Sequence, residues 1–524
     1  MQRSLLPIAA LLATGCDADF ALNAKDAADY DSGYYGGGQD AAADEDSDTF
    51  DDGYGSEEEN DFLSLLPATT RRYVFVVNTE RDTVSRISVP ELEVVTVPVG
   101  VRPRVISTAA DYSRAVTFNA GSDDLSIIDA DSLTVETVAV QPNLNQMVVS
   151  PDGRWAVVYH DIAAEDVDDD PPDGAISYNE ISLVDLENLR HVEAVVGTFP
   201  HGVQFTDDGS MAVVISDDYL AVLDLTEDDP DPLRIPLAED TLNPPAAEEV
   251  LLPPGGDYVF VRQYAVDALV LVDLNTAETE RLPVGLNPTD MDLSPDKSEA
   301  IVVARNSSEL WVYDVAAPRD TPKIVDMPTD DIYGSLLMSP DNTKGLLYST
   351  QSGQARYGVW DRATDTVETL PLEKPVSAVG VSPRGNTALV FHTFANGDID
   401  PASSFYDKHA LTLIELDGAS FFPNPIQLEA EPIAYANAAD GETGYFIMDG
   451  LPYLGILDYE AISHDIAPLP SEPVHLGTLP EEDTAFVNQV HDLGRLSFYD
   501  PNVDEDEAPL QTITGFELNS AIEQ

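Results

Sequence analysis

Cysteine is nearly absent from this chain. Cys16 is the only cysteine among 524 residues, so no disulfide can form within the chain. A zinc site made of several thiolates and a covalently attached c-type haem are excluded for the same reason. A chain of this length does not need disulfides, because a large domain can bury enough apolar surface without them.

Basic residues are also scarce. The chain has 25 lysines and arginines against 96 aspartates and glutamates, which gives a formal net charge of −71. Nucleic-acid phosphates and anionic lipid headgroups are bound by clusters of basic residues, so we exclude both as generic partners. The charge favours solubility, divalent cations and basic partners. It is equally compatible with a salty habitat, and the sequence does not separate these origins.

Long apolar runs, helical periodicity and the common catalytic motifs are missing as well. The run from Leu5 to Ala13 is too short to span a membrane. The chain contains no His-Glu-x-x-His, no Gly-x-Ser-x-Gly, no phosphate-binding loop and no dinucleotide fingerprint. The sequence therefore offers no ready assignment to a known enzyme class.

The N-terminus has the layout of an export signal. Arg3 is followed by the apolar run and then by small residues before Cys16. Leu12-Ala13-Thr14-Gly15-Cys16 resembles the bacterial lipoprotein box, with Ala13 where that box usually has Leu. The resemblance implies that residues 1–15 are removed and that Cys16 is lipidated. We therefore expect a protein anchored by its lipid in the bacterial cell envelope, at the outer membrane or cell surface rather than the inner membrane. The alternative is an ordinary secretory signal with an incidental cysteine.

Residues 16–61 are expected to form a disordered acidic linker. Residues 17–61 contain sixteen acidic residues and one lysine, with no apolar periodicity. Such a composition cannot bury enough surface to offset the entropy of ordering it. The third segment, residues 62–524, is predicted to be the folded domain.

A short phrase recurs about every 45 residues, a period typical of solenoids and propellers. It consists of a hydrophobic strand, a tight polar turn and another hydrophobic strand. Its clearest turns are Ser150-Pro151-Asp152-Gly153, Ser294-Pro295-Asp296-Lys297, Ser339-Pro340-Asp341-Asn342 and Ser382-Pro383-Arg384-Gly385. In the unit from 100 to 140, four short β-branched segments are separated by polar turns, which predicts a four-stranded antiparallel sheet. An aspartate closes the third strand, and we expect it to accept backbone N–H bonds in the following turn.

These phrases resemble the YVTN-type β-propeller repeat. Tyr73-Val74-Phe75-Val76-Val77-Asn78 with Thr83-Val84-Ser85 matches the opening strand and turn of that repeat. Val148-Val149-Ser150-Pro151-Asp152-Gly153 and the pairs Gly100/Pro103 and Gly285/Pro288 match the rest, over about residues 73–520. The resemblance implies an all-β propeller of four-stranded antiparallel blades. It says little about function, because relatives include surface adhesins, lactonases and cofactor-binding domains.

The number of turn phrases predicts the number of blades. Nine phrases follow residue 100, and residues 73–99 supply three further strands. Residues 514–520 look like a first strand with nothing after it, so we expect them to complete the blade begun at Tyr73. The prediction is about ten blades in one ring closed by the C-terminal strand, with eight or nine blades as the alternative.

Two units carry long insertions between their second and third strands, at 160–179 and 392–409. In such blades these loops share one face with the blade connectors, and propellers usually bind ligands there. The first insertion contains the alternating carboxylates Asp166, Asp168, Asp170 and Asp173, which could supply oxygens to Ca²⁺. Pro171 stands where a calcium loop of the EF-hand type needs glycine, so a solvated acidic loop is the alternative.

Five residues are candidates for that ligand-binding face: Arg104, His160, His201, His392 and His491. The histidines could bind a transition metal or act as bases. His160, His392 and His491 fall on the third, eighth and tenth units of a wide ring, so each could instead have a local structural role. Arg104 and His201 each follow a connector proline and are expected at the channel mouth.

Two functions remain open. The first is a non-catalytic, monomeric binding or scaffold protein for a protein, a cell-surface polysaccharide or a cation such as Ca²⁺. The second is a lactonase-like hydrolase that uses metal-bound water at the channel mouth. The second requires acids and histidines from several blades to meet at one point.

Overall fold

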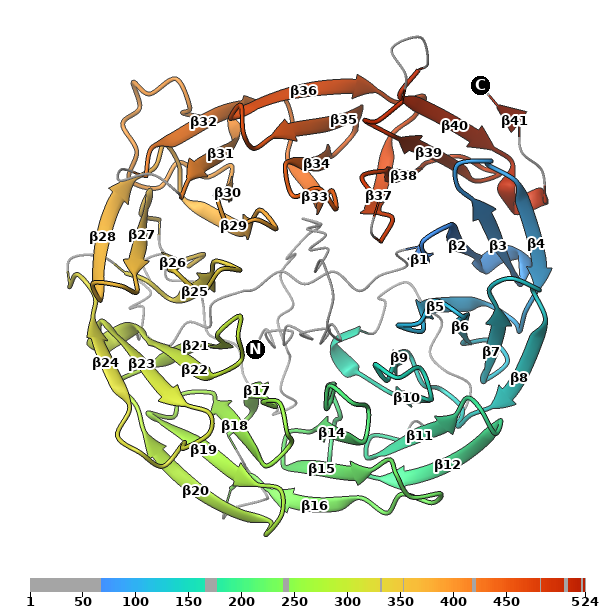
Figure 1. The fold of residues 1–524 in the computed structure, drawn as a ribbon, viewed down its shortest axis with the longest axis horizontal. Helices are drawn as coiled ribbons and strands as arrows, with labels where there is room; N and C mark the ends of the chain where they lie inside the picture. Colours follow the sequence, from blue (N-terminus) through green and yellow to red (C-terminus); the bar gives the residue numbers. More distant parts are fainter. Residues whose placement is uncertain are drawn as a thin grey trace, which may run out of the picture.

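The fold is a closed ring of ten antiparallel sheets, or blades, arranged around a common central axis (Figure 1). The computed structural model describes residues 67–164, 177–238, 245–329, 332–351, 353–416, 421–480, 482–503, 508–519 and 522–523. In each blade the strands follow chain order, with the first strand innermost and the fourth at the outer wall. The predicted β-propeller with ten blades of four antiparallel strands is therefore confirmed, and blade 10 carries one additional short strand, β41.

The strands of the first five blades are the following: β1 (Ala68–Thr69), β2 (Tyr73–Asn78), β3 (Thr83–Ser88) and β4 (Val94–Pro98) in blade 1; β5 (Pro103–Thr108), β6 (Arg114–Asn119), β7 (Asp124–Asp129) and β8 (Val135–Ala139) in blade 2; β9 (Gln146–Val149), β10 (Trp155–Tyr159), β11 (Glu180–Asp185) and β12 (Arg190–Val195) in blade 3; β13 (Gly202–Phe205), β14 (Met211–Ile215), β15 (Tyr219–Asp224) and β16 (Leu233–Pro236) in blade 4; β17 (Ala247–Leu251), β18 (Tyr258–Gln263), β19 (Ala268–Asp273) and β20 (Glu278–Pro283) in blade 5.

The strands of the last five blades are the following: β21 (Pro288–Leu293), β22 (Glu299–Ala304), β23 (Glu309–Asp314) and β24 (Lys323–Asp326) in blade 6; β25 (Ser335–Met338), β26 (Lys344–Tyr348), β27 (Arg356–Asp361) and β28 (Thr366–Pro371) in blade 7; β29 (Val376–Val381), β30 (Thr387–His392), β31 (His409–Glu415) and β32 (Pro423–Leu428) in blade 8; β33 (Pro432–Asn437), β34 (Thr443–Met448), β35 (Leu451–Asp458) and β36 (Ser463–Pro468) in blade 9; β37 (Pro473–Thr478), β38 (Ala485–Gln489), β39 (Arg495–Tyr499), β40 (Leu510–Thr514) and β41 (Ile522–Glu523) in blade 10.

Helix is almost absent from the described residues. Only four short 3₁₀ turns occur there: η1 (Thr79–Arg81), η2 (Ile162–Ala164), η3 (Arg305–Ser307) and η4 (Phe516–Leu518). In the part of the chain that the structure describes, no helix has the length and apolar character needed to cross a membrane.

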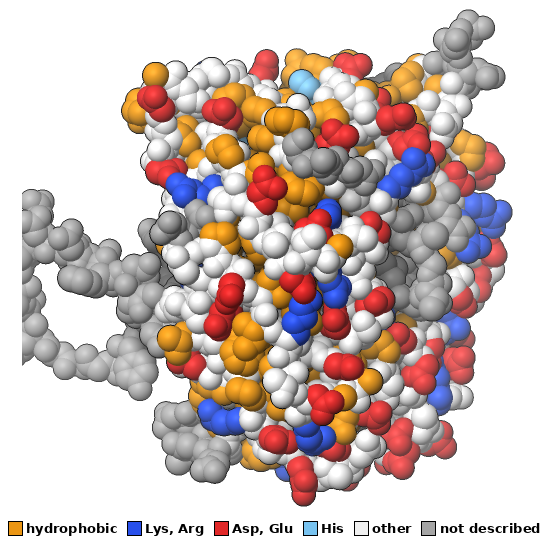
Figure 2. Space-filling view, turned by 60° about the vertical axis from the view of Figure 1, so that its left-hand side comes forward, with side chains coloured by type: hydrophobic (Ala, Val, Ile, Leu, Met, Phe, Trp, Pro, Cys, Tyr) orange, Lys and Arg blue, Asp and Glu red, His pale blue; other side chains and the backbone are white. Residues whose placement is uncertain are grey.

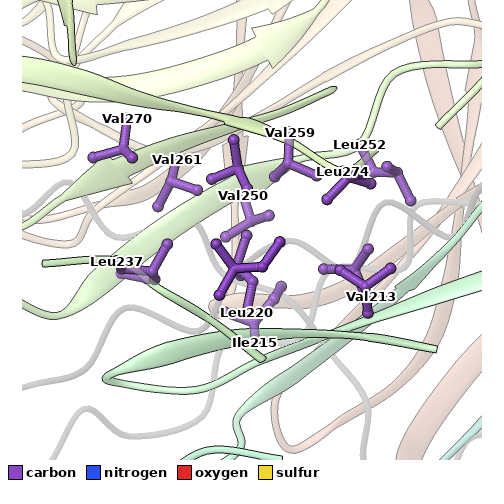
Figure 3. Close-up of a cluster of buried hydrophobic side chains, with 14 residues drawn as sticks. Val213, Ile215, Leu220, Leu237, Val250, Leu252, Val259, Val261, Val270 and Leu274 are labelled. Atoms are coloured by element: carbon purple, nitrogen blue, oxygen red, sulfur yellow. The ribbon is translucent and has the colours of Figure 1, made fainter. Parts of the chain in front are cut away.

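Neighbouring blades are held together by apolar side chains that fill the space between their sheets. The cluster between blades 4 and 5 shows the pattern (Figure 3): Val213 and Leu220 of blade 4 pack with Val250 and Val261 of blade 5. All four are at most 1% exposed. These β-branched and leucine side chains stand on the pleat faces that alternate along each strand, so each blade buries one face against each neighbour.

The ring closes differently from the prediction. Blade 1 takes its inner strand from β1, which pairs with Phe75 and Val74 of β2. Near the C-terminus, β40 is instead the fourth strand of blade 10, and the two-residue strand β41 pairs with its outer edge. Residues 514–520 do not run as a first strand, because Gly515 and Asn519 have φ of 96° and 55° and the chain between them turns as η4.

The seam between the termini is closed by packing and hydrogen bonds. Phe516 is 2% exposed and packs in one cluster with Val74 of blade 1 and Phe498 of blade 10. Its carbonyl accepts a hydrogen bond from Ser85 Oγ at 2.9 Å, and Asn519 Oδ1 accepts one from the Thr96 N–H at 2.7 Å. The C-terminal segment therefore seals the ring through η4 rather than through a shared sheet.

The ring has two distinct faces. The connector face carries the loops between second and third strands and the links between blades. Among the described residues, the loops are 79–82, 120–123, 160–164 with 177–179, 216–218, 264–267, 305–308, 349–351 with 353–355, 393–408, 449–450 and 490–494, and the links are 99–102, 140–145, 196–201, 237–238 with 245–246, 284–287, 327–329 with 332–334, 372–375, 429–431 and 469–472. The turn face carries the loops between first and second strands and between third and fourth strands. Since β1 is antiparallel to β2, and β2 ends on the connector face, the chain joins blade 1 from the connector side.

Aspartates organise the turns on the turn face. Asp129, at the end of the third strand of blade 2, accepts the Ser132 N–H at 2.7 Å. Asp224 does the same for Thr226 at 3.0 Å, and Asp314 for Ala316 at 2.8 Å. The prediction that the closing aspartate accepts backbone N–H bonds is confirmed, so part of the negative charge of the chain has a structural role.

These turns predict loss of stability in acid. Hydrogen bonds from Ser294 and Ser298 lower the pKa of Asp296 to about 2, and similar bonds lower the pKa values of Asp208 and Asp129. A carboxyl whose pKa is lower in the folded state stabilises the protein above its unfolded pKa, about 3.9, and loses that contribution as the pH falls through its folded pKa. We therefore expect the melting temperature to fall steeply between about pH 4 and pH 2. A melting temperature that stays level or rises to pH 2 would show that relief of charge repulsion outweighs these bonds.

Candidate functional site

The two insertions lie on opposite sides of the connector face. The first belongs to blade 3 and the second to blade 8, five positions apart in a ring of ten. Figure 1 shows β9–β12 and β29–β32 across the channel from each other. Any ligand that contacts both insertions must therefore span the channel mouth.

In blade 3 a histidine supports an exposed aromatic ring. His160 follows β10, is 4% exposed, and its Nδ1 lies 3.0 Å from the carbonyl oxygen of Asn143 in the preceding link. Its ring meets Tyr178 edge-on at 5.5 Å, and Tyr178 meets Phe199 in the same way at 5.5 Å. Tyr178 is 40% exposed, so the side of the ring that faces away from His160 and Phe199 is available to a ligand.

His201 lies beside this group. It stands just before β13, with Nδ1 at 3.0 Å from the Phe199 carbonyl and 3.6 Å from Asp217 Oδ1. Phe199 thus links His201 to Tyr178. The structure therefore places the predicted residues His160 and His201 on adjacent blades, at the two ends of one row of aromatic side chains.

In blade 8 a buried lysine holds the second insertion. Lys374 lies in the link before β29 and is fully buried. Its Nζ donates to the carbonyls of Phe394 at 2.9 Å and Phe405 at 3.5 Å, and to Asn396 Oδ1 at 3.3 Å. Burial lowers the pKa of Lys374. The negative charge of Asp407 acts in the opposite direction but is the smaller effect. The lysine joins both ends of the insertion to the wall of the ring.

The same insertion exposes a phenylalanine next to two histidines. His392 is 2% exposed, with Nδ1 3.1 Å from the Pro375 carbonyl and Nε2 2.7 Å from Thr412 Oγ1. Burial lowers the pKa of His392 to about 4, so this histidine is neutral at pH 7. Phe394 is 50% exposed and packs on His409 with ring centres 4.8 Å apart.

The two insertions share a local design. His160 and His392 both end the second strand of their blade and both contact a carbonyl 17 residues earlier, in the link to that blade. Each blade then presents one half-exposed aromatic ring against a histidine: Tyr178 against His160, and Phe394 against His409. The sequence singled out His160 and His392; His409, Lys374, Tyr178 and Phe394 were missed as site residues.

The role of Lys374 can be tested directly. We expect Lys374→Met to remove the donor of the Phe394 and Phe405 carbonyls and one of the two donors of Asn396 Oδ1, at a cost of roughly 2 kcal/mol. Amide hydrogen exchange across 393–408 should become at least about tenfold faster. Lys408→Met is the matched control, because Lys408 is an exposed lysine of the same insertion. Equal exchange rates in the two variants would contradict the role given to Lys374.

A second group of charged residues lies on the channel wall between blades 5 and 6. Arg262 of β18 is 3% exposed and donates to Glu249 Oε2 at 2.6 Å, to a carboxylate oxygen of Glu248, and to the Pro288 carbonyl at 3.2 Å. Burial acts to lower the pKa of Arg262, but the carboxylates of Glu249 and Glu248 outweigh burial and raise this pKa. Two carboxylates pair with the guanidinium, and two more lie nearby on the neighbouring strand β21: Asp290, whose charge acts on Arg262, and Asp292, whose charge interacts with those of Asp290 and Glu249.

The excess of carboxylates shifts their titration. Burial raises the pKa of Glu249, and this effect outweighs the positive charge of Arg262, which acts to lower it. Burial, then the charges of Asp290 and Glu249, raise the pKa of the half-buried Asp292 well above its ordinary value. Asp290 Oδ2 accepts the Leu336 N–H at 2.6 Å, which links this group to blade 7.

The remaining predicted residues are not brought into these groups. Arg104 lies in β5 at a break in the register between Pro103 and Val105. His491 follows β38 in blade 10, where its Nδ1 accepts the Leu493 N–H at 3.1 Å. Within the described ranges, no three His, Cys, Asp or Glu side chains gather so that they could hold a metal ion. Cys16, Asp166, Asp168, Asp170 and Asp173 lie outside the described residues.

Comparison with known proteins gives no family assignment. No protein-family model matches the chain, and no curated protein matches it either. Among solved structures, it is similar to dihydro-heme d1 dehydrogenase NirN in complex with DHE (16% identity, 68% of this chain and 73% of that chain, TM-score 0.42). It is also similar to apo AztD from Citrobacter koseri (15%, 62% and 89%, TM-score 0.38) and to Kuenenia stuttgartiensis hydrazine synthase (17%, 59% and 94%, TM-score 0.33). At these values the similarities carry no argument about function, and the propeller assignment rests on the ten sheets themselves.

Proposed function

We propose that this chain is a non-catalytic binding or scaffold protein of the YVTN-repeat kind, which holds a macromolecular ligand on its connector face. The observation that carries the proposal is the placement of the two insertions. They stand on opposite sides of one face, and each presents a half-exposed aromatic ring on a fixed base. Rigid, partly exposed aromatic side chains are typical anchors of binding surfaces.

The distance across the ring favours a large ligand. A small molecule can contact Tyr178 or Phe394, but only a protein or a polysaccharide can reach both across the channel. A hydrolase of the lactonase kind needs histidines and acids from several blades at one point. His160, His392 and His491 belong to blades 3, 8 and 10, so the geometry of the described residues does not favour that alternative.

The cellular setting is part of the proposal. The export signal and the lipoprotein-like box around Cys16 support a lipid-anchored monomer in the bacterial envelope, at the outer membrane or cell surface. The chain joins blade 1 from the connector side, so a lipid tether and the binding face would share one side of the ring. Mass spectrometry of the mature N-terminus tests the lipid: an acylated Cys16 is expected, and an unmodified cysteine would contradict the anchor.

We propose separately that the first insertion binds calcium. Calorimetry of the full chain with CaCl₂, compared with a variant lacking 165–175, tests it. Saturable binding that is lost on deletion supports a calcium loop at Asp166, Asp168, Asp170 and Asp173. Equal heats in both proteins would assign these acids to a solvated surface.

Binding on the connector face is tested with matched aromatic substitutions. The full chain is measured against the envelope fraction of the producing cells, alongside Phe394→Ala and Phe422→Ala. Both phenylalanines belong to blade 8 and are 50% and 66% exposed, but Phe422 precedes β32 on the turn face. We expect Phe394→Ala to weaken binding on the order of tenfold and Phe422→Ala to leave it unchanged. The reverse result, or equal binding by all three proteins, would contradict the proposed function.

A further inference from the structure

The connector face carries a ring of exposed apolar side chains. Among the described residues, those on this face that are large, apolar and exposed are Val101, Tyr178, Tyr264, Leu286, Ile332, Phe394 and Val490. On the turn face the corresponding residues are Leu189 and Phe422. Exposed apolar side chains that gather on one face mark interaction surfaces, whereas scattered ones do not.

Carboxylates stand between these apolar residues. Asp82, Asp218 and Asp267 lie in loops of this face, and each accepts a backbone N–H from a link between blades. Asp82 and Asp267 accept from the link to the next blade at 2.9 and 2.7 Å, and Asp218 accepts from the link that precedes its own blade at 2.7 Å. These bonds fix the carboxylates in place. Asp398 of the second insertion accepts the Ala355 N–H at 3.0 Å in the same way. The face is therefore apolar and negatively charged at fixed positions.

The rest of the surface adds to this field. Figure 2 shows acidic side chains distributed over the visible side of the ring, densest along its right-hand edge, with basic side chains lying among them. The chain as a whole has a formal net charge of −71. A partner of like charge is repelled at long range, whereas a basic partner is attracted and oriented.

We propose that the connector face is a docking surface for one basic protein, which spans the channel mouth and contacts Tyr178 and Phe394 on opposite sides. This inference rests on the proposed function and names the partner's chemistry. Lysine and arginine side chains of the partner would lie against the two aromatic rings and the fixed carboxylates. The aliphatic members of the ring, Val101, Leu286 and Ile332, favour a protein over a polysaccharide, because they offer apolar contact and no hydrogen bonds.

Site-specific photocrosslinking in the producing cells tests the inference. A p-benzoylphenylalanine replaces Tyr264 or Ile332 on the connector face of the full chain, and Leu189 or Phe422 on the turn face as matched controls. We expect adducts from the connector face alone, with a polypeptide whose isoelectric point is above about 9. Binding of that purified polypeptide should weaken on the order of tenfold when Tyr178→Ala or Phe394→Ala is introduced, and again when salt is raised from about 0.15 M to 0.5 M.

The other outcomes separate the two proposals. A connector-face adduct with a neutral or acidic protein, or one removed by glycosidase and not by protease, would overturn the basic partner while leaving a binding role for this face. Adducts from the turn face alone, or from no position, would overturn both. Equal binding of the polypeptide by the wild type and by both alanine variants would also overturn the inference.

Discussion

Replacing Arg262 with methionine should lower the free energy of unfolding by about 3–5 kcal/mol at pH 7. The substitution keeps most of the side-chain volume but removes the guanidinium that pairs with Glu249 and Glu248. Two carboxylates would then stand on the channel wall without their cation, beside Asp290 and Asp292. Urea denaturation at pH 7 measures the loss.

The pH dependence of this loss of stability shows whether charge or packing causes it. The penalty comes from ionised carboxylates, so it should shrink toward pH 4, because burial raises the pKa of Glu249 and lets it take up a proton more readily in the variant. A loss that is the same at pH 7 and pH 4 would indicate that missing packing, rather than charge, is responsible.

Asp292→Asn, in the same group of charges, is a control for which we expect an effect of the opposite sign. The pKa of Asp292 is raised in the folded state, so its ionised form destabilises the fold, increasingly as the pH rises from the unfolded pKa toward the folded one. Each unit of raised pKa corresponds to about 1.4 kcal/mol. The substitution should therefore raise the melting temperature at pH 7 and leave it unchanged below about pH 4, where the carboxyl is protonated in both states. A lower melting temperature at pH 7 would contradict this account of the group.

Replacing Phe516 with alanine should open the seam of the ring. Phe516 is 2% exposed and fills the space between blades 1 and 10, and removing a buried phenylalanine side chain costs about 3–5 kcal/mol. Its ring sits against Gly494, where a Cβ would come within 2.5 Å of the ring. The space that it leaves is therefore lined by backbone that cannot easily collapse.

Leu518→Ala is the matched control for the seam. Leu518 belongs to the same 3₁₀ turn but is 51% exposed, so its loss should change stability by no more than about 0.5 kcal/mol. Urea denaturation of the two variants compares them. Equal losses would show that η4 does not seal the ring through Phe516.

The repeat made the architecture predictable from sequence. Nine tight polar turns, each flanked by β-branched strands, together with the three further strands in residues 73–99 gave ten blades. The strand pattern alone could not place the ends of the chain. The sequence of residues 514–520 resembles that of a first strand, but Gly515 and Asn519 adopt positive φ. Whether this segment forms a strand or a turn depends on the packing of Phe516 in the seam between blades 1 and 10.

The candidate site was predictable only in part. The lengths of the two insertions placed them on blades 3 and 8, and the ten-blade count then put them on opposite sides of the ring. Lys374 stands in a polar link between Glu373 and Pro375, where nothing in the sequence distinguishes a buried lysine from an exposed one. Arg262 did leave a signal, because it is a charged residue in the otherwise apolar run of β18.

Hydrogen exchange of the full chain, with and without the envelope fraction of the producing cells, tests the central claim most directly. Binding on the connector face predicts slower exchange in 177–179, 196–201 and 393–408, on opposite sides of the ring, with no change in the turn-face segments 150–155 and 294–299. Protection confined to those turn-face segments, or to neither face, would contradict it.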